Sequence, residues 1–240
     1  RYPKQDFRPI HTLVNFGKSC TLLWKDKLGQ ISLSVTTLFW GAGATLQFLV
    51  LAWADTALGL DLSKAAILQG VVAIGIAIGA VLAASFVSLK KSIDVLPIGV
   101  VMGFSVAVMS FYRGTWIPGG FDLLGIYFSY AVIFACMMLI LVGMMAGFFV
   151  VPMNALLQHR GHVLMSAGRS IAVQNFNENS SILVMLALYS LLIKAGLGTV
   201  TIMVLFGIFV GFSMLAVILK HRHNQSKEDS LHLIGEDKRH

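Results

Sequence analysis

The most constraining feature of this sequence is a series of long apolar stretches that recur along most of its length. Each is about 20 residues long, which is what a helix needs to cross the hydrocarbon core of a bilayer. Hydrophobic residues make up 57% of the chain and charged residues only 12%, whereas about 25% of the residues in ordinary globular proteins are charged. Because lipid excludes irregular backbone and open sheet edges, we expect an all-α membrane protein.

Six of these stretches can be assigned to membrane-spanning helices, and their number excludes a signal peptide or a single anchor. The expected helices cover residues 31–54, 65–89, 95–111, 123–151, 166–193 and 199–219. Together they form a predicted six-helix bundle over residues 31–219. Residues 220–240 are charged and lack apolar periodicity, so we predict a disordered cytoplasmic tail there.

Residues 1–30 form a basic segment ahead of the first apolar stretch. Early prolines followed by apolar residues at roughly helical spacing predict an extended cytoplasmic linker and then a short amphipathic helix. This helix either lies on the membrane surface or is a solvated connector. The sequence opens at Arg1 without a methionine, so we expect that an upstream part of the protein is missing.

The basic residues are distributed unevenly between the two sides that six alternating helices would create. If residues 1–30 are cytoplasmic, only Lys64, Arg113 and Lys194 fall on the outer side. An excess of lysine and arginine in cytoplasmic loops is the usual pattern of membrane proteins, so both ends of this chain are predicted to be cytoplasmic. The net charge of +7 is explained by topology, and we expect no nucleic-acid partner.

Polar side chains interrupt the fifth apolar stretch. At about 100° per residue, one narrow helix face collects Ser170, Gln174, Asn177, Glu178 and Ser181. Lipid cannot solvate these groups, and a charged side chain near the bilayer centre costs about 2.5 kcal/mol or more. Such residues usually face a bundle interior or a wet cavity, so we predict that Gln174, Asn177, Glu178 and Ser181 bind substrate. The alternative for Glu178 is a structural bond between helices, to Asn154 or Gln158.

Three further residues are candidates for substrate binding. Trp40 and Gln47 lie in the first helix, and Asn154 follows the fourth. Gln47 either contacts substrate or makes a hydrogen bond to another helix, which is the commoner use of an amide at membrane depth. Gating candidates at the inner mouth of the fourth and fifth helices are Gln158, Arg160 and Arg169. The two arginines could instead be cytoplasmic anchors.

Enzyme motifs are absent from the sequence. It contains no zinc-binding His-Glu-x-x-His pair, no Gly-x-Ser-x-Gly nucleophile elbow and no phosphate-binding loop. His159 and His162 have no carboxylate or cysteine near them in the sequence, which favours an interfacial role over metal binding. We therefore predict that the chain is not an enzyme and needs no metal or cofactor. An intramembrane enzyme would need a nucleophile or metal set of this kind.

The distribution of polar residues resembles one half of a major facilitator superfamily transporter. The first, fourth and fifth helices carry most of them, and the third and sixth are plain. In that superfamily each half is a three-plus-three inverted repeat. Gly-Phe-Ser occurs in both plain helices, beginning at Gly103 and Gly211, which is a faint internal repeat.

Specific strings resemble the second half of the bacterial lysophospholipid transporter family. They are LFWGAGATL at 38–46, GFFVVPMNALLQ at 147–158, IAVQN at 171–175 and ENS at 178–180. The resemblance covers residues 32–220. It implies import of lysophospholipid, notably lysophosphatidylethanolamine, across the bacterial inner membrane, and delivery to a lysophospholipid acyltransferase.

The same resemblance implies a missing amino-terminal half of six helices, to which residues 1–30 would be the linker. One departure is Gln47, which stands where relatives can carry an arginine, so a phosphate contact there is in question. Two other functions remain open: a non-transporting membrane scaffold or assembly subunit, and a facilitator half for another amphipathic small molecule. A scaffold has no need of a carboxylate among amides in the fifth helix.

Overall fold

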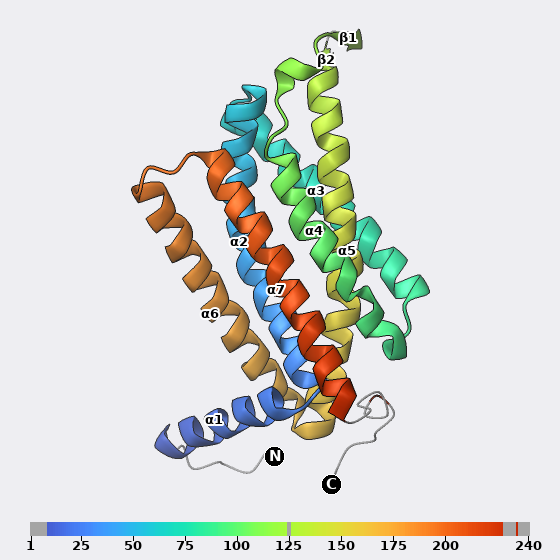
Figure 1. Ribbon diagram of the computed structural model, residues 1–240, viewed down its shortest axis with the longest axis vertical. Coiled ribbons are helices and arrows are strands. Elements are labelled where there is room, and N and C mark those ends of the chain that lie inside the picture. Colours follow the sequence, from blue (N-terminus) through green and yellow to red (C-terminus); the bar gives the residue numbers. More distant parts are fainter. Residues whose placement is uncertain (1–8, 124–125, 228–233, 235–240) are drawn as a thin grey trace, which may run out of the picture.

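A computed structural model describes residues 9–123, 126–227 and 234. Its helices are α1 (Pro9–Lys25), α2 (Gly29–Leu58), α3 (Leu62–Phe86), α4 (Leu96–Met109), α5 (Tyr130–Leu164), α6 (Ala167–Lys194) and α7 (Thr199–Lys227), as shown in Figure 1. Two short 3-10 helices are η1 (Leu89–Val95) and η2 (Gly114–Trp116), and a hairpin is formed by β1 (Gly120–Leu123) and β2 (Ile126–Ser129). Six segments, α2, α3, η1 with α4, α5, α6 and α7, are long and apolar enough to cross a membrane. The predicted all-α, six-helix membrane fold is confirmed.

The predicted start of the fourth spanning helix at residue 123 is wrong. Residues 120–123 instead pair with residues 126–129 as antiparallel strands, with Gly120 opposite Ser129. The rings of Phe121 and Phe128 stack across the pair with centroids 5.6 Å apart. Cross-strand aromatic pairs of this kind stabilise a sheet, and they hold this apolar segment out of the helix.

Two helix ends also lie beyond their predicted positions. Helix α5 continues through Pro152 to Leu164, because a proline inside a membrane helix is tolerated when neighbouring groups satisfy the freed backbone. Helix α7 continues to Lys227, so the first residues of the predicted disordered tail are helical. The rest of that tail lies outside the described residues, apart from Ile234, which is buried in the core.

Glycines set the closest helix contacts. A Cβ added to Gly75 on α3 would lie 3.1 Å from Cα of Gly143 on α5, and one added to Gly147 would lie 2.9 Å from the nitrogen of Ala80. Side chains at these positions would force the two backbones apart, whereas small residues let membrane helices approach closely. Helix α3 therefore packs chiefly on α5.

Helices α4 and α7 meet at the two Gly-Phe-Ser sequences. A Cβ on Gly103 would lie 2.8 Å from Cα of Gly211. The following residues, Phe104 and Phe212, make an edge-to-face contact with centroids 5.6 Å apart. The faint repeat in the sequence is thus a symmetric helix crossing.

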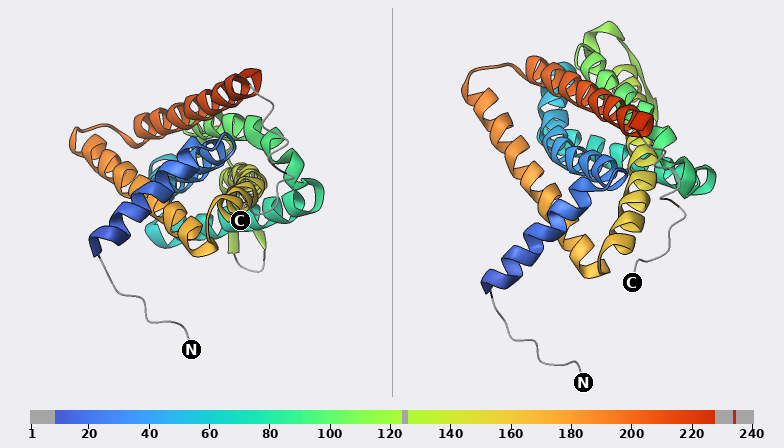
Figure 2. Two further views of the ribbon diagram at one scale, coloured as in Figure 1. Left: turned by 90° about the horizontal axis from the view of Figure 1, so that it is seen from below. Right: turned by 60° about the horizontal axis from the view of Figure 1, so that its bottom comes forward.

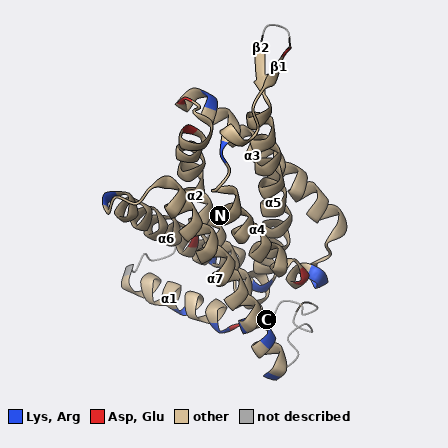
Figure 3. Cartoon of the chain, turned by 45° about the horizontal axis from the view of Figure 1, so that its top comes forward, with Lys and Arg blue, Asp and Glu red and all other residues tan. Residues whose placement is uncertain are grey.

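The six spans alternate in direction, so α1, η1, the α5–α6 connection and the end of α7 lie toward one end of the bundle (Figure 1). Helix α1 projects sideways from the bundle at this end (Figure 2). Charged residues gather at the helix ends, with few along the spans (Figure 3). In this arrangement α1 contacts both α5 and α6.

Candidate substrate site

An apolar cavity of about 670 Å³ lies among the six spanning segments. Trp40 and Gln47 of α2 line it, together with residues of α3, α4, α5, α6 and α7. Gln69 of α3 is a further polar lining residue, and its Nε2 donates to the backbone carbonyl of Gln47 at 3.0 Å. Gln69 was not among the predicted site residues, although an amide within an apolar stretch is a visible signal.

A second group of predicted residues joins α5 to α6. Nε2 of Gln174 donates to Oδ1 of Asn154 at 3.1 Å and to Oε1 of Glu178 at 2.8 Å. Glu178 is buried and also interacts with the hydroxyl of Thr36 on α2. The three residues form a polar cluster, Asn154–Gln174–Glu178, that connects three spanning helices.

Ser181 lies one turn beyond this polar cluster and packs against α2. A Cβ added to Gly41 would meet the Ser181 side chain, and it would lie 3.1 Å from Met185. Ser170 makes the equivalent close contact with Gly161 at the other end of α6. The small serines therefore bring α6 close to its neighbours, and Ser181 is a packing residue in this structure.

Helix α1 crosses α6 beside the polar cluster. Nε1 of Trp24 donates to Oδ1 of Asn177 at 3.3 Å, and Nδ2 of Asn177 donates to the carbonyl of Val173 at 2.8 Å. The rings of Phe16 and Phe176 contact edge to face with centroids 5.3 Å apart. Asn177, predicted to bind substrate, is thus covered by α1.

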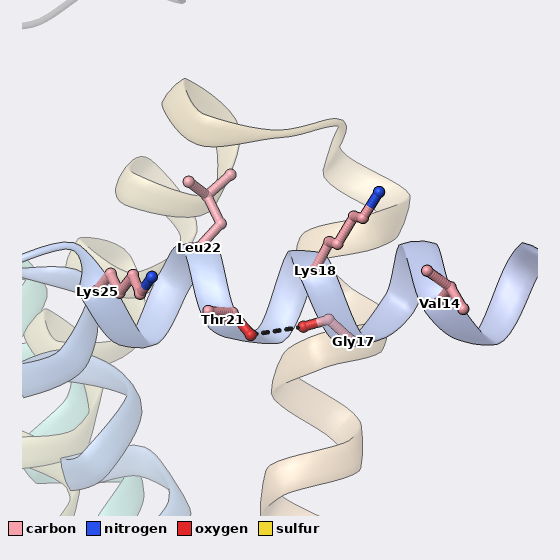
Figure 4. A pocket seen from close by; sticks show the side chains of 6 residues that line it. All are labelled: Val14, Gly17, Lys18, Thr21, Leu22 and Lys25. Atoms are coloured by element: carbon pink, nitrogen blue, oxygen red, sulfur yellow. Dashed lines mark hydrogen bonds between the residues drawn. The ribbon is translucent and has the colours of Figure 1, made fainter.

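The outer face of α1 carries a shallow groove (Figure 4). All of its lining residues come from α1 itself: Val14, Gly17, Lys18, Thr21, Leu22 and Lys25. A groove on one face of one helix cannot enclose a ligand. It does place two lysines beside exposed apolar side chains, which is the composition of helices that lie at a membrane surface.

Arg160, one of the gating candidates, forms an ion pair with Asp26, which follows α1. Their side chains are 1% and 9% exposed, Nη2 lies 2.6 Å from Oδ2, and Nε donates to Oδ1 at 3.0 Å. Oδ1 of Asp26 also accepts from the nitrogen of Gly29 at 2.6 Å, in the first turn of α2. Gln158 and Arg169 are exposed. Asp26 was not among the predicted site residues, although an acid between Lys25 and Lys27, just ahead of a spanning helix, is a visible signal.

Comparison with known proteins identifies the relatives of this chain. Over 197 residues, 82% of its length, it is 43% identical to a protein named lysophospholipid transporter LplT from Yersinia pestis (strain Pestoides F). The chain is therefore related to the bacterial lysophospholipid transporters. Proteins of the same name from Yersinia pestis bv. Antiqua (strain Angola) and Yersinia pseudotuberculosis serotype O:3 (strain YPIII) match with the same identity and coverage. No family model matches the chain, and no solved structure matches it.

The chain spans less than half the length of these lysophospholipid transporters, since the matched region is 44% of each. The resemblance that the sequence strings predicted is confirmed. With six spanning segments in the described residues, the chain is a multi-pass membrane protein related to transporters.

Proposed function

We propose that this chain is the carboxy-terminal half of a secondary transporter that moves lysophospholipid, notably lysophosphatidylethanolamine, across the bacterial inner membrane. The observation that carries the proposal is the 43% identity to relatives named for this transport, over most of the chain. The half-length match supports a second half of similar size. In this scheme an acyltransferase consumes the imported lysolipid, and the chain itself is not an enzyme.

The helix contacts support a facilitator half. If the two triplets are equivalent, α2 corresponds to α5, α3 to α6 and α4 to α7. The contact between α3 and α5 then corresponds to the contact between α6 and α2, and both contacts are extensive. The contact of α4 with α7 maps onto itself, and there the two Gly-Phe-Ser sequences cross. An inverted repeat of three plus three helices has this exchange symmetry.

The polar cluster suits the head group of an ethanolamine lysolipid. The group that donates to the Glu178 carboxylate at 2.8 Å is the Gln174 amide, which does not neutralise a negative charge. The ammonium group of the substrate would supply the positive charge that neutralises it. The amide of Gln174 holds Asn154 as well, so the same residue orients both neighbours.

The two arginines that were predicted to act in gating differ in their surroundings. Arg169 is exposed at the inner end of α6 and is free to meet a head-group phosphate or a lipid surface. Arg160 is buried against Asp26, so it joins the α1–α2 connection to the inner end of α5. We propose that this end, with α1 and both chain termini, is cytoplasmic, since the basic residues concentrate there.

The test is lysolipid movement into vesicles that contain the purified full-length protein. We expect labelled lysophosphatidylethanolamine to cross faster than in protein-free vesicles. The expected effect of Arg169→Gln is slower transport with normal membrane insertion, since only a gate or phosphate contact is lost. A membrane scaffold, the alternative function, would leave lysolipid movement at the protein-free rate.

A further inference from the structure

The cavity among the six spanning segments is separate from the polar cluster on α5 and α6. None of Asn154, Gln174 and Glu178 lines it. Its lining on the α3 side includes exposed residues such as Gly70, whereas Met203 of α7 is fully buried. The cavity therefore runs from an open side at α2 and α3 into the centre of the bundle.

The cavity walls have one chemical character. Apart from Gln47 and Gln69, and the indole of Trp40, the lining residues are aliphatic or phenylalanine side chains, methionines and glycines. A buried water needs two to four polar partners, and the side chains of these walls offer only the indole N–H of Trp40 away from the two glutamines. Such walls favour a hydrocarbon chain as the occupant, because an empty apolar cavity of this size would lose the packing energy of its lining atoms.

The polar groups occupy one side of the cavity only. Gln47 is exposed, Gln69 is half-buried, and the two are joined through the hydrogen bond to the Gln47 carbonyl. Side-chain amides both donate and accept, so they suit an ester, hydroxyl or phosphate oxygen. The whole cavity is thus polar at its open side and apolar at depth, like a single-chain amphiphile.

We propose that this cavity holds the acyl chain of the transported lysolipid inside the carboxy-terminal half, with the ester end of the chain at Gln47 and Gln69 and the head group outside the cavity. The proposal rests on the proposed function and adds a chain site to it. A volume of about 670 Å³ is that of a site for one small ligand, since such sites measure about 300–1,000 Å³.

Two glycines provide a way to fill the cavity without disturbing the fold. A Cβ added to Gly43 or to Gly70 meets no atom within 4 Å, although both residues line the cavity. Leucine at either position therefore extends into open space. Gly168, in the first turn of α6, also has no atom within 4 Å of an added Cβ, but it lies outside the cavity and is the matched control.

The experiment uses the full-length protein in lipid nanodiscs and lysophosphatidylethanolamine with a photoreactive diazirine at the end of its acyl chain. Labelled residues are mapped by mass spectrometry. We expect labelling at the deep walls, Met102, Val106 and Met203, and a loss of about tenfold in Gly70→Leu and Gly43→Leu. The Gly168→Leu variant keeps wild-type labelling.

Labelling confined to outward faces, or labelling unchanged in both cavity variants, would overturn the chain site. Lysolipid transport by the same wild-type sample is measured in vesicles. Transport without labelling of the deep walls removes the chain site and leaves the proposed function. Labelling of the deep walls without transport keeps the site and removes the proposed function.

Discussion

Asp26 and Arg160 form a buried ion pair, so each offsets the cost of burying the charge of the other. Removing one partner of a buried ion pair leaves an uncompensated charge, and this typically costs about 3–5 kcal/mol. Asp26 has a second task, because it accepts from the Gly29 nitrogen at the start of α2. An amide at position 26 keeps an acceptor for Gly29 and removes the charge.

We therefore predict that Asp26→Asn lowers the free energy of unfolding by about 3 kcal/mol, the lower end for a broken buried pair. Arg169→Gln, at an exposed arginine in the same region, should change it by less than about 0.5 kcal/mol. Denaturant unfolding of the purified protein in detergent measures both. In the double variant Asp26→Asn/Arg160→Gln part of the loss returns; strictly additive losses would show that the two residues are not coupled.

Glu178 gives a second prediction at this scale. Glu178→Gln keeps the shape and a hydrogen-bonding partner for Gln174, but it removes the charge that we assign to the substrate ammonium. Uptake of an ethanolamine lysolipid should fall about tenfold or more, since a hydrogen bond to a charged group is worth about 1.5–3 kcal/mol. Yield after detergent extraction should stay near wild type.

Glu178→Leu is the companion variant, and it should lower both uptake and yield because Gln174 loses its partner on the same helix. Wild-type uptake by Glu178→Gln would show that the carboxylate serves only to join helices. Sequence periodicity was enough to predict that Gln174 and Glu178 share a helix face. The bond from Gln174 to Asn154 depends on how α5 and α6 pack, which no periodicity within one helix records.

At the scale of helices, glycines spaced four apart favour tight packing but do not identify the partner helix. Gly75 and Gly143 both belong to small-residue pairs that are visible in the sequence, and the structure brings them together. A glycine can also face open space, as Gly70 does on the same helix. Spacing alone cannot distinguish a glycine that packs against another helix from one that faces open space, because both occur as glycines within an apolar stretch.

This difference gives a third prediction. Gly75→Leu should destabilise the protein by about 1–3 kcal/mol, because the new side chain meets the α5 backbone. Gly70→Leu on the same helix should be neutral or slightly stabilising, since glycine is about 1 kcal/mol less favourable than most residues inside a helix. Thermal unfolding in detergent compares them. Equal destabilisation by the two leucines would contradict the α3–α5 packing described here.

The sequence was least informative at the connection before α5 and at Pro152. Residues 120–129 are apolar enough to continue a spanning helix, and the pairing of 120–123 with 126–129 as strands depends on contacts such as that of Phe121 with Phe128. Pro152 reads as a helix end because it lacks an N–H group, yet α5 runs through it. Neither the strand pairing nor the continuation of α5 through Pro152 follows from local residue preference.

At the scale of the whole molecule, the exchange symmetry of the two helix triplets accounts for which helices pack together. It also separates two kinds of surface. Helices α4 and α7 bury their glycine faces against each other, whereas α6 has few buried residues although it carries the polar cluster. Because few residues of α6 are buried within this chain, its exposed face is suited to contact with the second half of the transporter.

The most direct test of the central claim, that this chain is one half of a two-half lysolipid transporter, compares the full-length protein with residues 1–240 alone. Both are reconstituted in vesicles at equal protein density, and entry of labelled lysophosphatidylethanolamine is followed. We predict transport by the full-length protein and none above protein-free vesicles by residues 1–240, because a facilitator moves its substrate at a site between two halves. Transport by residues 1–240 at the full-length rate would contradict the claim.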